Sequence, residues 1–144
     1  MKDYSNPVFQ EIAEQISKSQ ETIININIAD IECISLQHFL TRHYYYTVIV
    51  DDYAFDIYNK ASLLEALYYQ AKLITVHDLN WDAIQEGLND ALSNFLEFTG
   101  VCLLFKKGYF LKNRLPDEFK MLTEVINDIN SKYQGKQIKI LLNQ

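Results

Sequence analysis

Carboxylates recur at every fourth residue near the middle of the chain, at Asp78, Asp82, Glu86 and Asp90. At 3.6 residues per turn, the last three fall on one side of a helix that begins near Leu79. Like charges four residues apart repel by roughly 0.2–0.5 kcal/mol per pair. No Lys or Arg between Lys72 and Lys106 relieves this repulsion. The acidic face therefore requires either water or a basic partner.

Carboxylates at this spacing could act in catalysis, bind a metal or bind a basic protein. An acid/base pair of Asp82 and Glu86 would need a raised pKa, and hence a pocket, but these side chains lie on a convex helix face. The sequence has no Gly-rich phosphate loop, nucleophile elbow or Cys–His motif, so we expect neither an enzyme nor a catalytic residue. The His residues lack metal-ligand spacing and the acids match no calcium loop, so we expect no metal and no cofactor. A solvated face and a protein-binding surface remain as interpretations.

The charge of the chain fits a basic partner. Its 144 residues include 19 acidic and 13 basic side chains and carry a net charge of −6, which argues against direct nucleic-acid binding. No signal-peptide core and no membrane-length apolar run are found, so we expect a cytoplasmic protein without a membrane contact. Cys33 and Cys102 lie in separate apolar runs and are expected to be buried free thiols. Nothing in the sequence fixes an oligomeric state.

The acidic helix must be held by the elements around it. Its opposite side carries Trp81, Ile84 and Leu88, which would pack on a core. Apolar strands are predicted at 44–50, 101–105 and 138–142. Helices lie between them, one starting at Asn59 or Ser62 and one at Pro116, and this alternation predicts a parallel sheet. The basic segment between the second of these strands and Pro116 is predicted to be a loop; it carries Lys106, Lys107, Lys112 and Arg114.

The first 45 residues carry structure signals but no chemical motif. Asn6-Pro7 is typical of a helix start, and the apolar face that follows extends to about Lys18. Residues 22–28 alternate apolar and polar, as in a half-buried strand, and Ser35 would cap a short helix. We therefore divide the chain into an N-terminal extension, residues 1–45, packed on a main domain, residues 46–144.

The run Asn80-Trp81-Asp82-Ala83-Ile84, followed by Glu86 and Leu88, is the most specific motif in the chain. Together with the preceding SLLEALYYQ, the order of elements and the closing IKILL strand, it resembles the barstar family of ribonuclease inhibitors over about residues 46–143. The resemblance implies an α/β fold with a three-stranded parallel sheet packed by helices. It also implies an immunity protein that blocks the basic active site of a nuclease toxin, in the first place a ribonuclease.

The same resemblance assigns the contact surface to the acidic helix and the loop before it. Asp82 and Glu86 match the family's two acidic contact positions. The full set of expected partner-binding residues is His77, Asp78, Asn80, Asp82, Gln85, Glu86 and Asp90. Trp81, Ile84 and Leu88 would hold this surface rigid.

Departures from the family pattern leave a second interpretation open. The loop 76–79 lacks the family's Gly or aromatic residue, Gln85 replaces an aromatic, and Gly87 lies inside the helix at a cost of about 1 kcal/mol relative to Ala. Gly87 would either admit a partner's backbone or be neutral. The alternative is a non-inhibitory interaction module of the same fold that binds another basic partner.

Overall fold

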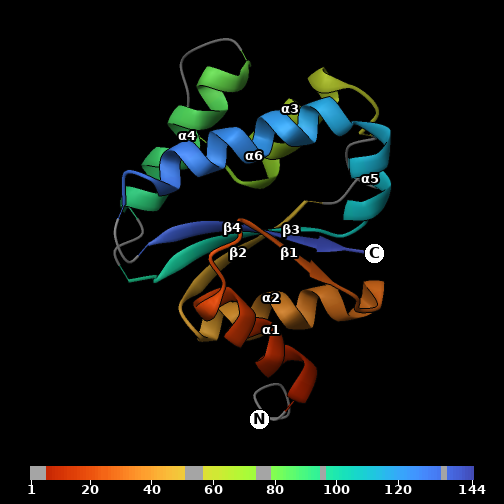
Figure 1. Ribbon diagram of the computed structural model, residues 1–144, viewed down its shortest axis with the longest axis vertical. Coiled ribbons are helices and arrows are strands. Elements are labelled where there is room, and N and C mark those ends of the chain that lie inside the picture. The colour runs from red at the N-terminus through yellow and green to blue at the C-terminus, as the bar shows by residue number, and fades with distance from the viewer. Residues whose placement is uncertain (1–5, 51–56, 74–78, 95–96, 134–135) are drawn as a thin grey trace.

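A computed structural model describes residues 6–50, 57–73, 79–94, 97–133 and 136–144 (Figure 1). Its described part contains one sheet of four strands in the order β1-β4-β3-β2, and every neighbouring pair is parallel. The strands are β1 (Ile23–Ile26), β2 (Tyr45–Val50), β3 (Gly100–Phe105) and β4 (Gln137–Asn143). The predicted α/β class and parallel sheet are thus confirmed.

Helices cover both faces of the sheet and produce three layers (Figure 1). One face packs against α3 (Lys60–Gln70), α4 (Trp81–Asn94) and α6 (Pro116–Asn130), with α5 (Gly108–Arg114) at the end of that layer. The other face packs against α1 (Pro7–Lys18) and α2 (Cys33–Arg42), which follows the short 3-10 helix η2 (Asp30–Glu32). None of the described helices is long and apolar enough to cross a membrane.

Alternation along the central strands divides the interior into two apolar cores. On β4, Ile138, Ile140 and Leu142 face the α3–α4–α6 layer, whereas Leu141 faces α1 and α2 together with Cys102 and Leu104 of β3. All six residues of β3 are buried. A strand buried on both sides has to be apolar throughout, as the run VCLLF is.

The expectation of a three-stranded sheet is wrong, because a strand of the N-terminal extension joins the sheet. β1 pairs with β4 in parallel, from Ile23 opposite Ile140 to Ile26 opposite Asn143. Its Ile24 and Ile26 are buried in the α1–α2 core. The alternating pattern predicted the strand, but a strand pattern does not name the edge on which it pairs.

The prediction of a loop between Lys106 and Arg114 is also wrong, since Gly108–Arg114 forms α5. The helix lies against the end of β4, where Leu111 is buried. A Cβ on Gly108 would lie 2.5 Å from Cδ1 of Leu142, so glycine permits this close approach. Seven residues with one buried apolar side chain are too short for a helical period to be recognised.

Helix starts follow the expected capping residues at α1 and α3, but the expectation of a Ser35 cap is wrong, because α2 begins at Cys33 with Glu32 at its N-cap position and no side-chain cap. The side chain of Asn6 accepts hydrogen bonds from the backbone N–H groups of Val8 and Phe9, at 2.9 and 3.2 Å. Of the two candidates for α3, the cap is Asn59, whose Oδ1 accepts from the Ser62 N–H at 2.9 Å. Predicted features at Phe95, Leu96 and Gly135 lie outside the described residues.

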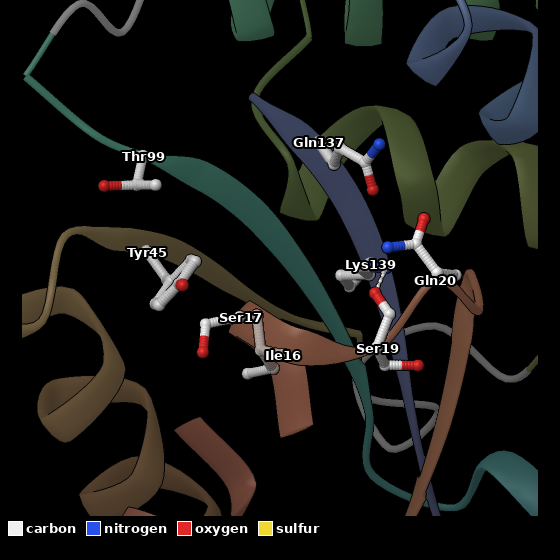
Figure 2. Close-up of a pocket in the computed structure, with 8 residues that line it drawn as sticks. All are labelled: Ile16, Ser17, Ser19, Gln20, Tyr45, Thr99, Gln137 and Lys139. Carbon is white, nitrogen blue, oxygen red and sulfur yellow. Dashed lines mark hydrogen bonds between the residues drawn. The ribbon is translucent and has the colours of Figure 1, made fainter. Parts of the chain in front are cut away.

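Polar contacts tie the extension to β4 across the sheet. Lys139 is 3 % exposed, and its ammonium donates to the Ser19 carbonyl oxygen at 3.0 Å (Figure 2). It also donates to the Glu21 carbonyl oxygen at 2.6 Å. The Asn143 amide accepts from the Ile28 N–H at 2.9 Å and donates to the Ile28 carbonyl at 3.1 Å. The extension therefore contributes a strand, a helical layer and specific hydrogen bonds.

Both cysteines are buried free thiols, which confirms the expectation from sequence. Burial raises the pKa of Cys102 to about 12. The thiol is therefore neutral at physiological pH and is a packing residue of the α1–α2 core.

We expect that the chain fails to fold without the extension. A fragment of residues 46–144 would expose the apolar sheet face around Leu104 and Leu141, so it should aggregate in size-exclusion chromatography and bind a hydrophobic dye. A monomeric fragment that unfolds cooperatively would contradict this.

A single substitution tests the same core in the full-length chain. Phe39→Ala, at a fully buried site, should lower the free energy of unfolding by about 3–5 kcal/mol. Phe110→Ala, at an exposed site, should lower it by less than about 0.5 kcal/mol.

Lys139 should impose a pH dependence on stability. Desolvation lowers its pKa from the usual 10.5 in the folded chain, against smaller opposite effects of Cys102 and Glu21. Between the folded pKa and 10.5 the unfolded chain binds more protons, so this lysine makes the free energy of unfolding rise with pH. The stability of wild type relative to Lys139→Met should therefore grow between neutral pH and about pH 10 in urea titrations. Lys120→Met, at an exposed site, serves as control, and an equal pH dependence in both variants would refute the assignment.

Candidate functional site: the acidic helix

α4 belongs to the same helical layer as α3 and α6 and contacts both (Figure 1). Its sequence is WDAIQEGLNDALSN. Ile84, Leu88 and Leu92 are between 0 and 2 % exposed and belong to the main core. Trp81 is partly buried and packs against the same core. The inner face expected from sequence is thus the face that the helix buries.

Asn80 begins the helix as its capping residue. Its Oδ1 accepts a hydrogen bond from the Ala83 N–H at 2.8 Å, and its carbonyl accepts from the Ile84 N–H at 3.1 Å. The helix therefore starts at Trp81, slightly later than the expected start near Leu79. Asn80 is exposed, but its side-chain oxygen is already used within the chain. The structure gives this predicted contact residue a positioning role.

Asp82, Glu86 and Asp90 are all exposed on the outer side of α4; we call these three residues the acidic ridge. The described residues provide no ion pair or hydrogen bond to the side chain of Asp82 or Asp90. Asp82 lies in the first turn, where the helix dipole favours a negative charge. The ridge thus presents carboxylates from a helix that is fixed by its buried inner face.

One flank of the ridge is joined to α6. Gln85 is half-buried and its Nε2 donates to the Asp128 carboxylate. About two turns further on, Ser93 Oγ lies 3.1 Å from the Tyr133 hydroxyl. Gln85, which the sequence suggested as a partner contact, is therefore also a brace between two helices.

The other flank of the ridge borders a hollow of about 420 Å³ between α4 and the end of α3. Gly87 lies here, and a Cβ at this position would come within 3.0 Å of the Leu73 Cβ. Close packing inside the chain thus accounts for the glycine, which the sequence left open. The hollow itself was missed from sequence, because residues of α4, of the segment after α3 and of β2 form it together.

His77 and Asp78 lie outside the described residues, so they remain predictions from sequence. Of the loop 76–79, the structure describes only Leu79, which is half-buried.

A second hollow, of about 310 Å³, lies near the amino ends of β2 and β4 (Figure 2). Lys139 lines it together with Ser17, Ser19, Gln20, Thr99 and three other residues, none of which is Asp, Glu or His. The lysine ammonium is engaged with two backbone carbonyls. The hollow's main feature is therefore the polar contact that holds the extension. Within the described part of the chain, no group of three or more His, Cys, Asp or Glu residues could hold a metal ion.

Comparison with known families matches residues 49–143 to the family described as "Barstar (barnase inhibitor)". The chain therefore belongs to the barstar family, as its sequence motifs predicted. The match runs from within β2 to the end of β4 and leaves out α1, β1 and α2. Members of this family are inhibitors rather than enzymes. Searches of curated proteins and of solved structures find no match to the chain.

The capping role of Asn80 can be tested by its effect on stability. Asn80→Ala should lower the free energy of unfolding by about 0.5–2 kcal/mol, because the Ala83 N–H loses its acceptor. Asn80→Asp or Asn80→Ser should restore most of that loss. Asn94→Ala, at the far end of the same helix, is the matched control. Equal stabilities for Asn80→Ala and Asn94→Ala in urea unfolding would contradict the assignment.

Proposed function

We propose that this chain is an immunity protein that inhibits a nuclease toxin, in the first place a ribonuclease, by placing the acidic ridge of α4 in the basic active site. The observation that carries the proposal is the exposure of Asp82, Glu86 and Asp90 on a helix whose inner face is buried. Membership of a family of barnase inhibitors supports the same partner class.

The chemistry of a ribonuclease site explains why carboxylates would block it. Such a site binds a phosphodiester, so it carries Arg, Lys and His side chains. Carboxylates take the place of phosphate oxygens, and Arg donates two parallel hydrogen bonds to a carboxylate. Asp82 and Glu86 are one helical turn apart, so they can occupy neighbouring phosphate-binding positions.

Rigidity and charge contribute to tight and fast binding. Ile84, Leu88 and Leu92 fix the helix, and the Asn80 cap fixes its first turn, so little conformational freedom remains to be lost on binding. A net charge of −6 attracts a basic enzyme and speeds association. Speed matters for a protein that must protect the cell that makes a nuclease.

The second candidate is a non-inhibitory module that binds another basic protein. Asn80 and Gln85 make hydrogen bonds within the chain, so the surface left for a partner is the acidic ridge and the hollow beside it. This smaller surface favours the second candidate. The two functions differ in their genetic context and in one assay. A nuclease gene beside this one and inhibition of its product support the immunity protein, whereas binding to a basic protein without inhibition supports the module.

Charge reversal tests the role of the ridge. Asp82→Lys and Glu86→Lys should each weaken inhibition by at least about 2 kcal/mol, roughly 30-fold, because each leaves basic groups of the nuclease buried without a partner. The assay is cleavage of fluorescent RNA and DNA oligonucleotides by barnase and by nucleases encoded beside the gene.

A double variant on the opposite layer is the matched control. Glu11→Lys with Glu14→Lys changes the net charge by the same amount as the double ridge variant, and both sites are exposed on α1. It should leave inhibition within about threefold of wild type, because surface charges far from an interface contribute little. If a nuclease is inhibited equally by the ridge variant and by wild type, the ridge is not its binding site.

A further inference from the structure

The hollow beside the acidic ridge has walls that are rigidly built. α3 ends in a Schellman motif, in which the Lys72 N–H donates to the Tyr69 carbonyl at 3.3 Å and the Leu73 N–H to the Tyr68 carbonyl at 3.0 Å. The contact between Leu73 and Gly87 then fixes the end of α3 against α4. A volume of about 420 Å³ lies within the range of roughly 300–1,000 Å³ that is typical of ligand pockets.

Lys72 is an unusual residue for its place at the hollow. Its φ is +54°, in the left-handed region where glycine is preferred after a helix. A lysine there carries backbone strain that a glycine would relieve. Strain retained at a pocket points to a function for the side chain.

The lining combines an apolar floor with two opposite charges. Ala71, Leu73, Gly87 and Ala91 contribute apolar surface and Tyr46 an aromatic ring, whereas Lys72, Asp90 and Asn94 bring charged or polar groups. Among the described residues, no ion pair joins Lys72 to Asp90. Both charges are therefore available to an occupant of the hollow.

An aromatic side chain with a hydrogen-bond donor is suited to all parts of this lining. An arginine or lysine would face the like charge of Lys72, and a carboxylate would face that of Asp90. An aliphatic side chain would cover the floor, but it would remove water from both charged groups without offering a hydrogen bond in place of that water. An aromatic ring with a hydrogen-bond donor covers the floor, attracts the Lys72 ammonium to its face, and donates to Asp90 or Asn94.

We propose that this hollow receives a tyrosine side chain of the inhibited nuclease and thereby selects which nuclease is bound. The inference rests on the proposed function, because it takes the ridge to be the centre of the interface. Asp90 belongs to both the ridge and the hollow, so one surface would offer carboxylates to the active site and an aromatic pocket beside it. Buried aromatic anchors of this kind dominate many protein interfaces.

The occupant class can be tested without the nuclease. The probe is N-acetyl-tyrosinamide, titrated into the full-length chain labelled with ¹⁵N and followed by amide chemical shifts. Shifts should concentrate at Leu73, Gly87, Asp90 and Ala91. Tyrosinamide should bind about tenfold more tightly than N-acetyl-leucinamide or N-acetyl-argininamide, from the combined cation–π contact and hydrogen bond. Equal affinity for the three compounds, or shifts located elsewhere, would overturn the proposal.

Two variants separate a binding role from a structural role. Ala91→Phe fills the hollow and should abolish the tyrosinamide shifts, whereas Ala13→Phe, the same change at another half-buried helix position, should retain them. Lys72→Gly should raise the melting temperature by relieving strain and still weaken tyrosinamide binding severalfold. A Lys72→Gly protein that binds tyrosinamide as tightly as wild type would contradict a role for the ammonium.

A nuclease arm distinguishes failure of this inference from failure of the proposed function. With any nuclease that the chain inhibits, Ala91→Phe should weaken inhibition at least tenfold by faster dissociation, and unchanged inhibition would overturn the inference alone. The ridge variant Asp82→Lys with Glu86→Lys should lose inhibition but keep tyrosinamide binding. Tyrosinamide binding in a chain that inhibits no nuclease would retain the hollow as an aromatic-binding site and refute the immunity function.

Discussion

The sheet of this chain is apolar on both faces, so both faces must be removed from water. β3 is buried along its whole length, and its side chains enter two separate cores. One helical layer can cover only one of these cores, and the part of the chain that matches the barstar family supplies that layer as α3, α4 and α6. The extension supplies the other as α1 and α2 and pairs β1 with β4. The boundary between residues 1–45 and 46–144 therefore divides the sequence but not the hydrophobic core, because residues from both parts share the α1–α2 core.

The position of the acidic ridge follows from the same burial. Because Ile84, Leu88 and Leu92 are committed to the core, the 3.6-residue period leaves Asp82, Glu86 and Asp90 no direction but outward. The free energy of repulsion among these carboxylates is small compared with the free energy gained by burying three large apolar side chains. The fold thus stabilises an array of like charges that an isolated helix would not favour. A basic partner would relieve that repulsion, and for this reason we connect the ridge with binding.

Local patterns predicted the elements that depend on local physics. The Asn6 cap, the outward and inward faces of α4 and the three strands of the family region were accessible because periodicity and capping act within a few residues. The pairing of β1 with β4 was not accessible, since many sheet edges fit one strand. The reason for Gly87 was hidden as well, because its neighbour Leu73 comes from the segment that follows α3. The bond from Gln85 to Asp128 and the left-handed Lys72 likewise depend on tertiary contacts that no short pattern encodes.

Carboxyl footprinting tests the central claim, that the ridge is the surface that meets the nuclease. The free chain and its complex with an inhibited nuclease would be labelled with a carbodiimide and an amine, and the modification of each acid read by mass spectrometry. Our account predicts that labelling of Asp82, Glu86 and Asp90 falls on binding, while that of Glu11 and Glu14 on the opposite layer stays unchanged. Protection of Glu11 and Glu14 with continued labelling of the ridge would contradict it.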